Sequence, residues 1–566
     1  MSALNLSGLG QAKQIVENTL SELLKENVIG RIWQKDHTVW SDDPKEISNR
    51  LGWLDCIDTA KKFLPEVNEF VQEIKSEKYK NVLVMGMGGS SLAPEVFSLI
   101  FGKDERLLNV YVLDSTHPEA VKNFADKLNH EETLYIVSTK SGGTAETLSF
   151  MKFFYNLIRN EYGIEKAGKQ FVAITDPGSG LQKIAGELNF RKIFLNDPDI
   201  GGRYSALSLF GLVPAALVGV DLEKLLQSAE TAVMKSKINE ADKIHENNAA
   251  ILGSLLGALA NEGKNKLTLL YSDEIKYFGS WLEQLIAEST GKNGKGIFPV
   301  DLEAQTEVEN YGTDRIFVYT RLNDDHPYDE LVHKLKNAGH PVVEVMLNDL
   351  YSIGAEYFNW EMATAIAGWK MKLQPFDQPN VESAKVQAKK LVAEYQERGM
   401  LQSPKLSYED ESITVYGHEE SKSIEEALNN LLSKVEKNKS YIAIQGFVNP
   451  DEETFEAFNS LRSKLLNKYK VATSFGFGPR FLHSTGQLHK GDDGSGLFLQ
   501  FIESGSLNLP IPDNADDNDS QITFDVLIRA QALGDREALI QNSRHVITFD
   551  IRSDLIDQLK QITEMI

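Results

Sequence analysis

Short apolar runs alternate with amphipathic segments along most of this 566-residue chain. Between about residues 80 and 220 the apolar runs have the length and composition of buried parallel strands, and the segments between them repeat their apolar positions with helical spacing. This alternation predicts an open parallel α/β sheet with helices on both faces. We expect strands at 81–86, 109–113, 134–138, 171–175 and 192–195, and helices at 91–102, 118–127, 144–159, 180–187 and 205–218.

A second α/β unit is expected after a charged helical stretch at 222–246. Its strands are predicted at 266–271, 315–320 and 341–346, and its helices at 247–261, 277–289, 327–337, 354–372 and 380–397. The polar segment 398–440 resembles a linker with one strand at 413–416. Alternation then resumes, with strands predicted near 441–445, 470–474, 496–502 and 545–551.

A chain of this length is too long to fold around one hydrophobic core, so several domains are expected. The patterns above divide it into four parts. We expect a helical N-terminal segment at 1–75, a first α/β domain at 76–220, a second at 221–400 and a C-terminal α/β segment at 401–566. The acidic stretch 510–520 is predicted to be an exposed, mobile loop.

Composition excludes several classes of function. The net charge of −23 argues against a basic face for nucleic acid or an anionic membrane, so an anionic ligand needs its own positive pocket. The single cysteine, Cys56, excludes an intrachain disulfide and a multi-thiolate metal site. No signal peptide is visible, and the longest apolar stretch, 206–220, is short and interrupted, so a cytoplasmic protein is expected.

Two loops that follow predicted strands have the composition of a phosphate site. Residues 86–91 read Gly-Met-Gly-Gly-Ser-Ser, and residues 138–144 hold four hydroxyls, two glycines and Lys140. Glycine allows close approach of the backbone to a ligand, and free N–H groups at a helix start favour an anion. A tight turn and a solvated polar loop are the alternatives, and Ser91 stands where a dinucleotide fingerprint needs glycine. The two loops together favour phosphate.

Two further segments carry candidate catalytic groups. Gly-Gly-Arg-Tyr-Ser at 201–205 sets Arg203 at a helix start, where a guanidinium could stabilise an oxyanion; an exposed arginine is the alternative. Gln284 and Glu288 are four residues apart and share a helix face, although a lone helical glutamate is usually a solvated charge. Glu283 and Glu274 are equally plausible by composition.

Two later segments are less specific. The helix after Phe-Asp-Gln-Pro at 376–379 carries Lys385, which by pattern alone is a surface lysine. His483 and His489, two of eleven histidines, lie among small polar residues and could transfer protons near neutral pH. Their spacing of six residues does not suit a helical metal site.

Taken in order along the chain, these motifs resemble the phosphoglucose isomerase family, which is built on sugar isomerase (SIS) domains. The resemblance covers roughly residues 45–400, and His-Ser-Thr-Gly-Gln at 483–487 extends it. The segments 46–53 and 529–535 are similar to the isomerase portion of bifunctional transaldolase/phosphoglucose isomerase proteins, and the chain is too short to hold a transaldolase barrel as well. The resemblance implies two SIS-type αβα sandwich domains with parallel sheets, a helical N-terminal lead-in and a C-terminal α/β extension.

The resemblance also implies roles for residues at matching positions. Arg203 would stabilise an enediolate, Glu288 would be the catalytic base, and His483 with Lys385 would open the sugar ring. The sugar phosphate and the rest of the substrate would be held by Gly89, Ser90, Thr139, Lys140, Ser141, Thr144, Gly202, Gln284 and Gln378. The reaction would interconvert glucose 6-phosphate and fructose 6-phosphate, without a metal or other cofactor.

One departure concerns His483, which follows the Phe-Asp-Gln segment by about a hundred residues although in most of the family the histidine precedes it. In relatives that histidine comes from the neighbouring subunit, so the resemblance implies a homodimer with a shared active site. A non-catalytic sugar-phosphate sensor and an isomerase that also accepts mannose 6-phosphate are the alternatives. An amidotransferase-linked isomerase would need an N-terminal cysteine nucleophile, and Cys56 is the only cysteine.

Overall fold

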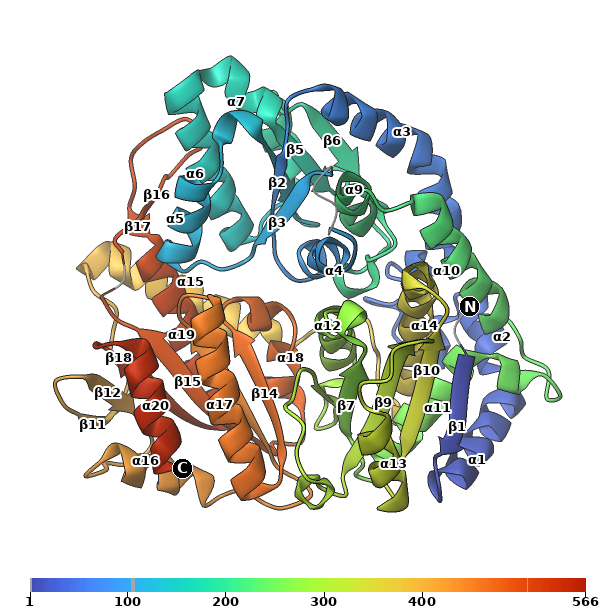
Figure 1. Ribbon diagram of the computed structural model, residues 1–566. Helices are drawn as coiled ribbons and strands as arrows, with labels where there is room; N and C mark the ends of the chain where they lie inside the picture. Colours follow the sequence, from blue (N-terminus) through green and yellow to red (C-terminus); the bar gives the residue numbers. More distant parts are fainter. Residues whose placement is uncertain (1–2, 103–106, 506) are drawn as a thin grey trace.

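The computed structural model describes residues 3–102, 107–505 and 507–566. Three α/β units, each built around its own sheet, meet near the centre of the molecule (Figure 1). The predicted α/β class with parallel sheets is confirmed. The helices α4, α12 and α18, one from each unit, lie closest to the point where the units meet.

The first unit has five parallel strands in the order β3-β2-β4-β5-β6. Successive residues of the interior strand β2 alternate between two apolar cores, with Val82 and Val84 in one and Leu83 and Met85 in the other. Both faces are therefore covered, as the continuous apolar runs predicted. The elements are β2 (Asn81–Gly86), β3 (Asn109–Leu113), β4 (Thr133–Ser138), β5 (Phe171–Thr175), β6 (Lys192–Leu195), α3 (Cys56–Ser76), α4 (Leu92–Phe101), α5 (Pro118–Lys127), α6 (Ala145–Tyr162), α7 (Ile164–Gln170), α8 (Gly180–Glu187) and α9 (Leu209–Val218).

The second unit has five strands in the order β1-β10-β9-β7-β8, parallel except for β1 at the edge. Its largest apolar core is continuous with that of the first unit. The elements are β7 (Lys266–Tyr271), β8 (Phe298–Val300), β9 (Arg315–Leu322), β10 (Val342–Leu347), α1 (Ala12–Lys25), α2 (Val28–Trp33), α10 (Leu222–Ser236), α11 (Asn248–Asn261), α12 (Phe278–Thr290), α13 (Asp329–Asn337) and α14 (Ile353–Met371).

The N-terminal segment is not entirely helical, which corrects the expectation for residues 1–75. Strand β1 (Ala3–Gly8) pairs antiparallel with β10, with Leu4 opposite Val345. The run is only six residues long, and its partner lies more than 330 residues further along the chain. Only the tertiary fold brings this edge to the N-terminus, so local periodicity carried no signal for it.

The third unit has six strands in the order β11-β12-β18-β15-β13-β14, of which β18, β15, β13 and β14 run parallel. Helix α15 was expected to be the last helix of the second unit, but it packs along α19 of the third. The two helices are so close that a Cβ on Gly534 of α19 would lie 2.8 Å from the Ala388 nitrogen of α15. The elements are β11 (Leu406–Glu409), β12 (Ile413–Tyr416), β13 (Tyr441–Phe447), β14 (Ala472–Phe477), β15 (Gly496–Glu503), β18 (His545–Ile551), α15 (Val381–Arg398), α16 (Ile424–Leu432), α17 (Glu452–Tyr469), α18 (Gly486–Gly491), α19 (Phe524–Gln541) and α20 (Leu555–Met565).

The acidic stretch 510–520 is largely exposed, as expected, but it is anchored at several points. Its first residues form β16 (Pro510–Ile511), which pairs with β17 (Ile522–Thr523). The backbone oxygens of Asn514 and Asp517 accept hydrogen bonds from the Asn156 side chain of α6. Main-chain acceptors, which composition does not reveal, therefore dock the segment on the first unit.

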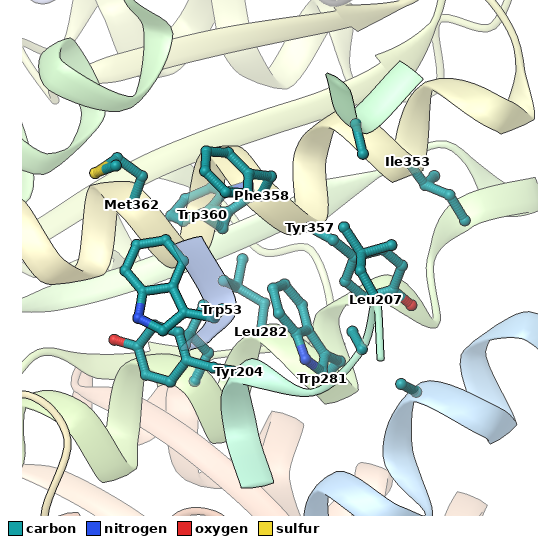
Figure 2. Close-up of a cluster of buried hydrophobic side chains, with 14 of the residues drawn as sticks. Trp53, Tyr204, Leu207, Trp281, Leu282, Ile353, Tyr357, Phe358, Trp360 and Met362 are labelled. Carbon is teal, nitrogen blue, oxygen red and sulfur yellow. The ribbon is translucent and has the colours of Figure 1, made fainter. Parts of the chain in front are cut away.

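An aromatic cluster fixes α12 and the segment at 202–204 against α14 (Figure 2). Trp281 of α12 lies 4.6 Å from Tyr357 of α14, measured between ring centroids. Trp53 lies 5.2 Å from Tyr204 and 5.7 Å from Phe358 in the same way. Large buried aromatic rings contribute strongly to core stability. The cluster therefore holds in place the two segments that carry Arg203 and Glu288.

Candidate active site

The two predicted phosphate loops lie side by side, because β2 and β4 are neighbouring parallel strands with Gly86 opposite Ser138. Gly88 has a φ of 56°, which favours glycine. The hydroxyls of Thr139 and Thr144 are 2.9 Å apart. Helix α6 then begins at Ala145 without a side-chain cap, so the N–H groups of its first turn are available to an anion.

The other loop residues divide into buried and exposed groups. Ser90 is buried and Ser141 is exposed, with the Ser141 oxygen accepting a hydrogen bond from the Gly143 amide. The ammonium of Lys140 is bound by the Asp176 carboxylate and donates to the Pro198 carbonyl at 2.7 Å. Lys140 therefore ties this loop to the segments that follow β5 and β6, and its expected contact with the sugar phosphate stays a prediction.

A close backbone contact joins the first loop to the segment that carries the arginine. A Cβ on Gly89 would lie 1.9 Å from the Gly202 carbonyl oxygen, so only glycine fits at position 89. The contact brings the end of β2 against the short helix Gly202–Tyr204. The predicted substrate-binding glycines therefore meet because of the backbone packing between their two segments.

Arg203 is buried and uses its whole guanidinium group. Nη1 donates to Glu288 Oε2 at 3.2 Å and to Gln378 Oε1 at 2.6 Å, and Nε donates to Ser289 Oγ at 2.9 Å. Nη2 donates to the carbonyl oxygens at 375 and 377, at 2.6 and 3.0 Å. The planar guanidinium group has five N–H donors, which suits an arrangement in which Arg203 connects two other expected site residues, Glu288 and Gln378.

Glu288 lies on α12 with 7% of its surface exposed. Burial raises the pKa of its carboxyl group above the ordinary value, although the positive charges of Arg203, His483 and Lys385 oppose the shift. A carboxylate that the interior disfavours, beside a cation that stabilises it, is typical of a catalytic base.

Gln284, one turn before Glu288, links α12 to the third unit. Its Nε2 donates to the His483 carbonyl oxygen at 2.8 Å, and a Cβ on Gly88 would lie 2.8 Å from that same Nε2. A Cβ on Gly291, at the end of α12, would lie 2.3 Å from Leu488 Cα of α18. These close contacts bring His483 to the site within its own chain, which corrects the expectation that the histidine comes from a neighbouring subunit.

A series of hydrogen-bonded polar side chains, which the sequence did not predict, extends from the His483 ring. His483 Nε2 lies 3.0 Å from Glu146 Oε1, and Gln531 Nε2 donates to the same oxygen at 2.8 Å. Thr116 in turn donates to Gln531 Oε1 at 2.7 Å. Burial would raise the pKa of Glu146, but the charge and hydrogen bond of His483 outweigh it, and the pKa is lowered. No spacing rule connects residues 146, 483 and 531, so only the fold reveals them.

The structure distinguishes the two candidate histidines. His489 is buried between the rings of Tyr441, Phe481 and Phe498, and burial holds its pKa well below the ordinary value. His489 is therefore a core residue, whereas His483 shares hydrogen bonds with the site.

Lys385 and Gln378 come from the segment between α14 and the middle of α15. Lys385 is exposed and its ammonium lies 3.2 Å from Glu382 Oε1. Its positive charge contributes a lowering effect to the pKa of Glu288, against the larger effect of burial, and to that of Glu146. It has no hydrogen bond to the other expected catalytic residues within the described chain.

Lys292 is a second residue that the sequence did not single out for a role. Its ammonium is buried and donates to the Gln374 carbonyl at 3.0 Å and to the Asp377 carboxylate at 2.7 Å. Burial and the nearby Arg203 lower its pKa to about 7, against the opposing charge of Asp377. Lys292 and Arg203 together hold the segment that presents Gln378.

In the described part of the chain, no helix is long and apolar enough to cross a membrane. Within the same residues, no three His, Cys, Asp or Glu side chains gather in a way that could hold a metal ion.

Comparisons with known proteins agree with this geometry. The family model described as phosphoglucose isomerase matches residues 51–298, which include both loops, Arg203 and Glu288. The "Probable glucose-6-phosphate isomerase" of Methanococcus maripaludis is 30% identical over 382 residues, covering 60% of this chain and 84% of that protein. A glucose-6-phosphate isomerase of Streptococcus pneumoniae is 27% identical over 388 residues, covering 60% of this chain and 86% of that protein.

Among solved structures, a glucose-6-phosphate isomerase from Chlamydia trachomatis aligns with a TM-score of 0.54 at 19% identity, covering 68% of this chain and 86% of that one. A hypothetical protein from Thermus thermophilus aligns with a TM-score of 0.57 at 23% identity, covering 69% of this chain and all of that one. Similarity at this level of identity supports the fold. The sequence matches go further, and this chain belongs to the phosphoglucose isomerase family.

Proposed function

We propose that this protein interconverts glucose 6-phosphate and fructose 6-phosphate through a cis-enediolate. The observation that carries the proposal is the buried pair of Arg203 and Glu288, 3.2 Å apart, beside two loops with the composition of a phosphate site. A base and a cation at this separation can act on one carbon and its neighbouring oxygen at once.

In the proposed reaction the sugar phosphate binds the loops after β2 and β4 and the first turn of α6. His483, oriented by Glu146, exchanges a proton with the ring oxygen and so opens the ring. Glu288 then removes the proton from C2, and Arg203 stabilises the negative oxygen of the enediolate. Glu288 returns the proton to C1, which is adjacent in the planar intermediate, while the O2 hydroxyl gives up its proton and O1 takes one up. C2 is oxidised as C1 is reduced, so the aldose becomes a ketose with no external oxidant or reductant.

The direct test is conversion of fructose 6-phosphate to glucose 6-phosphate by the purified protein in EDTA, followed with a coupled dehydrogenase. We expect rapid turnover. A folded protein that binds the sugar phosphate without converting it would overturn the proposal in favour of a sensor. Turnover of mannose 6-phosphate at a similar rate would extend the substrate range.

Replacement of Glu146 by glutamine should slow ring opening, because the imidazole loses the carboxylate that orients it. We expect a loss of about 10- to 100-fold, which is smaller than the 10²–10⁴-fold contribution of a general acid–base group. Ring opening alone can be measured as exchange between the α and β anomers of glucose 6-phosphate by NMR. Anomer exchange at the wild-type rate in the Glu146→Gln protein would contradict a positioning role for Glu146.

Specific activity should not depend on association between chains, because Arg203, Glu288, Gln284 and His483 are connected within one chain. A homodimer remains the prediction for the quaternary state. Activity per unit mass should therefore stay constant across a dilution series in which sedimentation shows the dimer to dissociate. A fall in activity that follows dissociation would show that a second chain contributes to the site.

A further inference from the structure

A cavity of about 340 Å³ lies in the third unit, away from the candidate active site. Its walls come from the segment after β12, from α16 and from the connection between α19 and β18. It shares no residue with the phosphate loops, with α12 or with the segment around His483. The proposed isomerase reaction therefore makes no use of it.

The lining of this cavity holds more basic than acidic side chains, in contrast to the chain as a whole. His418, Lys434, Arg544 and His545 contribute to the lining, and Glu419 is its only carboxylate. The whole chain has 82 acidic against 59 basic residues, so an excess of basic groups in one cavity runs against the composition of the chain. A local reversal of charge in an acidic protein concentrates anions at that place.

Three of these four groups have no polar partner of their own. In the described chain the Lys434 ammonium makes no ion pair, and the ring nitrogens of His418 and His545 make no hydrogen bond. The two imidazole rings lie edge to face with centroids 6.1 Å apart. Arg544, by contrast, is buried and anchored, since it donates to the carbonyl oxygens at 489, 490 and 492 and pairs with Asp492. The cavity thus has one fixed cation at its base and three free polar groups.

Burial and the neighbouring positive charges both disfavour the protonated forms of the two histidines. Burial lowers the pKa of His418, and the charges of Arg536, His545, Lys434 and Lys405 lower it further. Burial and the charge of Lys434 lower the pKa of His545 in the same way. An anion among these groups would offset the mutual repulsion and allow both rings to take up protons.

The remainder of the lining indicates what the anion is attached to. Ala427, Leu431 and Ile547, which belong to one apolar core, supply an aliphatic wall, and Ser421 and Ser543 supply hydroxyls. Concave sites with a mainly apolar wall and a few convergent polar groups are typical of small-molecule binding. The volume exceeds what an inorganic anion alone needs.

We propose that this cavity binds a small organic anion, a phosphate or carboxylate group carried on a mainly apolar body. The charged group lies among Lys434, His418 and His545, and the body lies against the aliphatic wall. Binding at this site is separate from binding of the sugar phosphate, because no residue belongs to both sites.

NMR titration of the histidine rings of the full-length protein tests the proposal, with phenyl phosphate and benzoate as probes and phenol as the neutral control. His418 and His545 can be assigned from the His418→Gln and His545→Gln variants. We expect one or both anions to raise the pKa of both histidines by about 1 or more, and phenol to leave them unchanged. The stronger of the two anions identifies the preferred charged group.

Two variants separate this site from the active site. Lys434→Gln should weaken binding of the effective anion several-fold without changing isomerase activity. Lys437→Gln removes the same charge from an exposed neighbour outside the cavity, so it should leave both anion binding and isomerase activity unchanged. Failure of both anions to move His418 and His545 would overturn the proposal. A response confined to His483 would overturn it as well, since it would locate all anion binding in the active site.

Discussion

Replacement of Glu288 by glutamine should abolish nearly all isomerase turnover while the protein remains folded. The amide cannot accept the C2 proton, and loss of a general base typically costs about 10²–10⁴-fold in rate. The carboxylate is buried and its pKa is raised, so a neutral amide removes a charge that the interior disfavours. The free energy of unfolding should therefore not fall. The coupled assay and thermal unfolding of the same preparation measure the two effects.

Glu283→Gln is the matched control for this experiment. Glu283 precedes Gln284 on the same helix, and burial and the nearby Asp301 raise its pKa to about 8, so near pH 7 it is largely protonated. Its amide variant should keep close to wild-type activity. Anomer exchange of glucose 6-phosphate should also survive in Glu288→Gln, because ring opening uses His483. Wild-type turnover in Glu288→Gln would exclude Glu288 as the base.

The rate of the wild-type enzyme should fall towards acid pH at a higher pH than an ordinary glutamate would give. The base must be ionised to accept a proton, an unperturbed glutamate has a pKa of about 4.3, and burial raises the pKa of Glu288. The pH dependence of kcat/KM measures this fall in rate on the acid side of the profile. A rate that is constant down to about pH 4 would contradict the assignment.

Replacement of Arg203 by lysine should lower kcat by about 10²–10³-fold, the usual cost of losing one oxyanion donor. Lysine keeps the charge but is a point cation, so it cannot reproduce the five contacts of the guanidinium fork. The carbonyl oxygens at 375 and 377 would lose their donor, and the segment that presents Gln378 should loosen. We therefore also expect a higher KM for the sugar phosphate.

Arg191→Lys serves as the control, since it makes the same change in the first unit. Arg191 pairs with Glu73 and Glu77 and touches none of the expected site residues. Its variant should have wild-type steady-state constants. If Arg203→Lys retained activity within a few-fold of the wild type, the guanidinium could not be the main stabiliser of the enediolate.

Much of the first unit could be predicted from the sequence. The strand predicted at 81–86 agrees with β2, and the strand predicted at 134–138 agrees with β4 apart from one residue at its start. A strand buried on both faces needs a continuous apolar run, and a run of this kind ends visibly where glycines and hydroxyls begin. The position of both loops at one edge of the sheet then follows from the parallel topology.

Contacts between residues far apart in the sequence could not be predicted from local patterns. The sequence placed Lys140 in a phosphate loop but gave no sign that Asp176 and Pro198 bind its ammonium group. Nothing in the sequence distinguished Glu146 from the polar residues around it. It pairs with His483 only because the third unit packs against the first. The family resemblance implied a histidine from a neighbouring subunit, and no local pattern shows that the third unit folds back onto the first two.

The sequence by itself determined the α/β class, the two loops and the set of residue types that the family requires, because each depends on neighbours within a few positions. The tertiary structure alone decided that β1 joins the edge of the second sheet, that His483 rather than His489 reaches the site, and that a cationic cavity forms around His545. These features depend on contacts between residues far apart in the chain. Such contacts form only when burial of the apolar faces fixes the three units against one another.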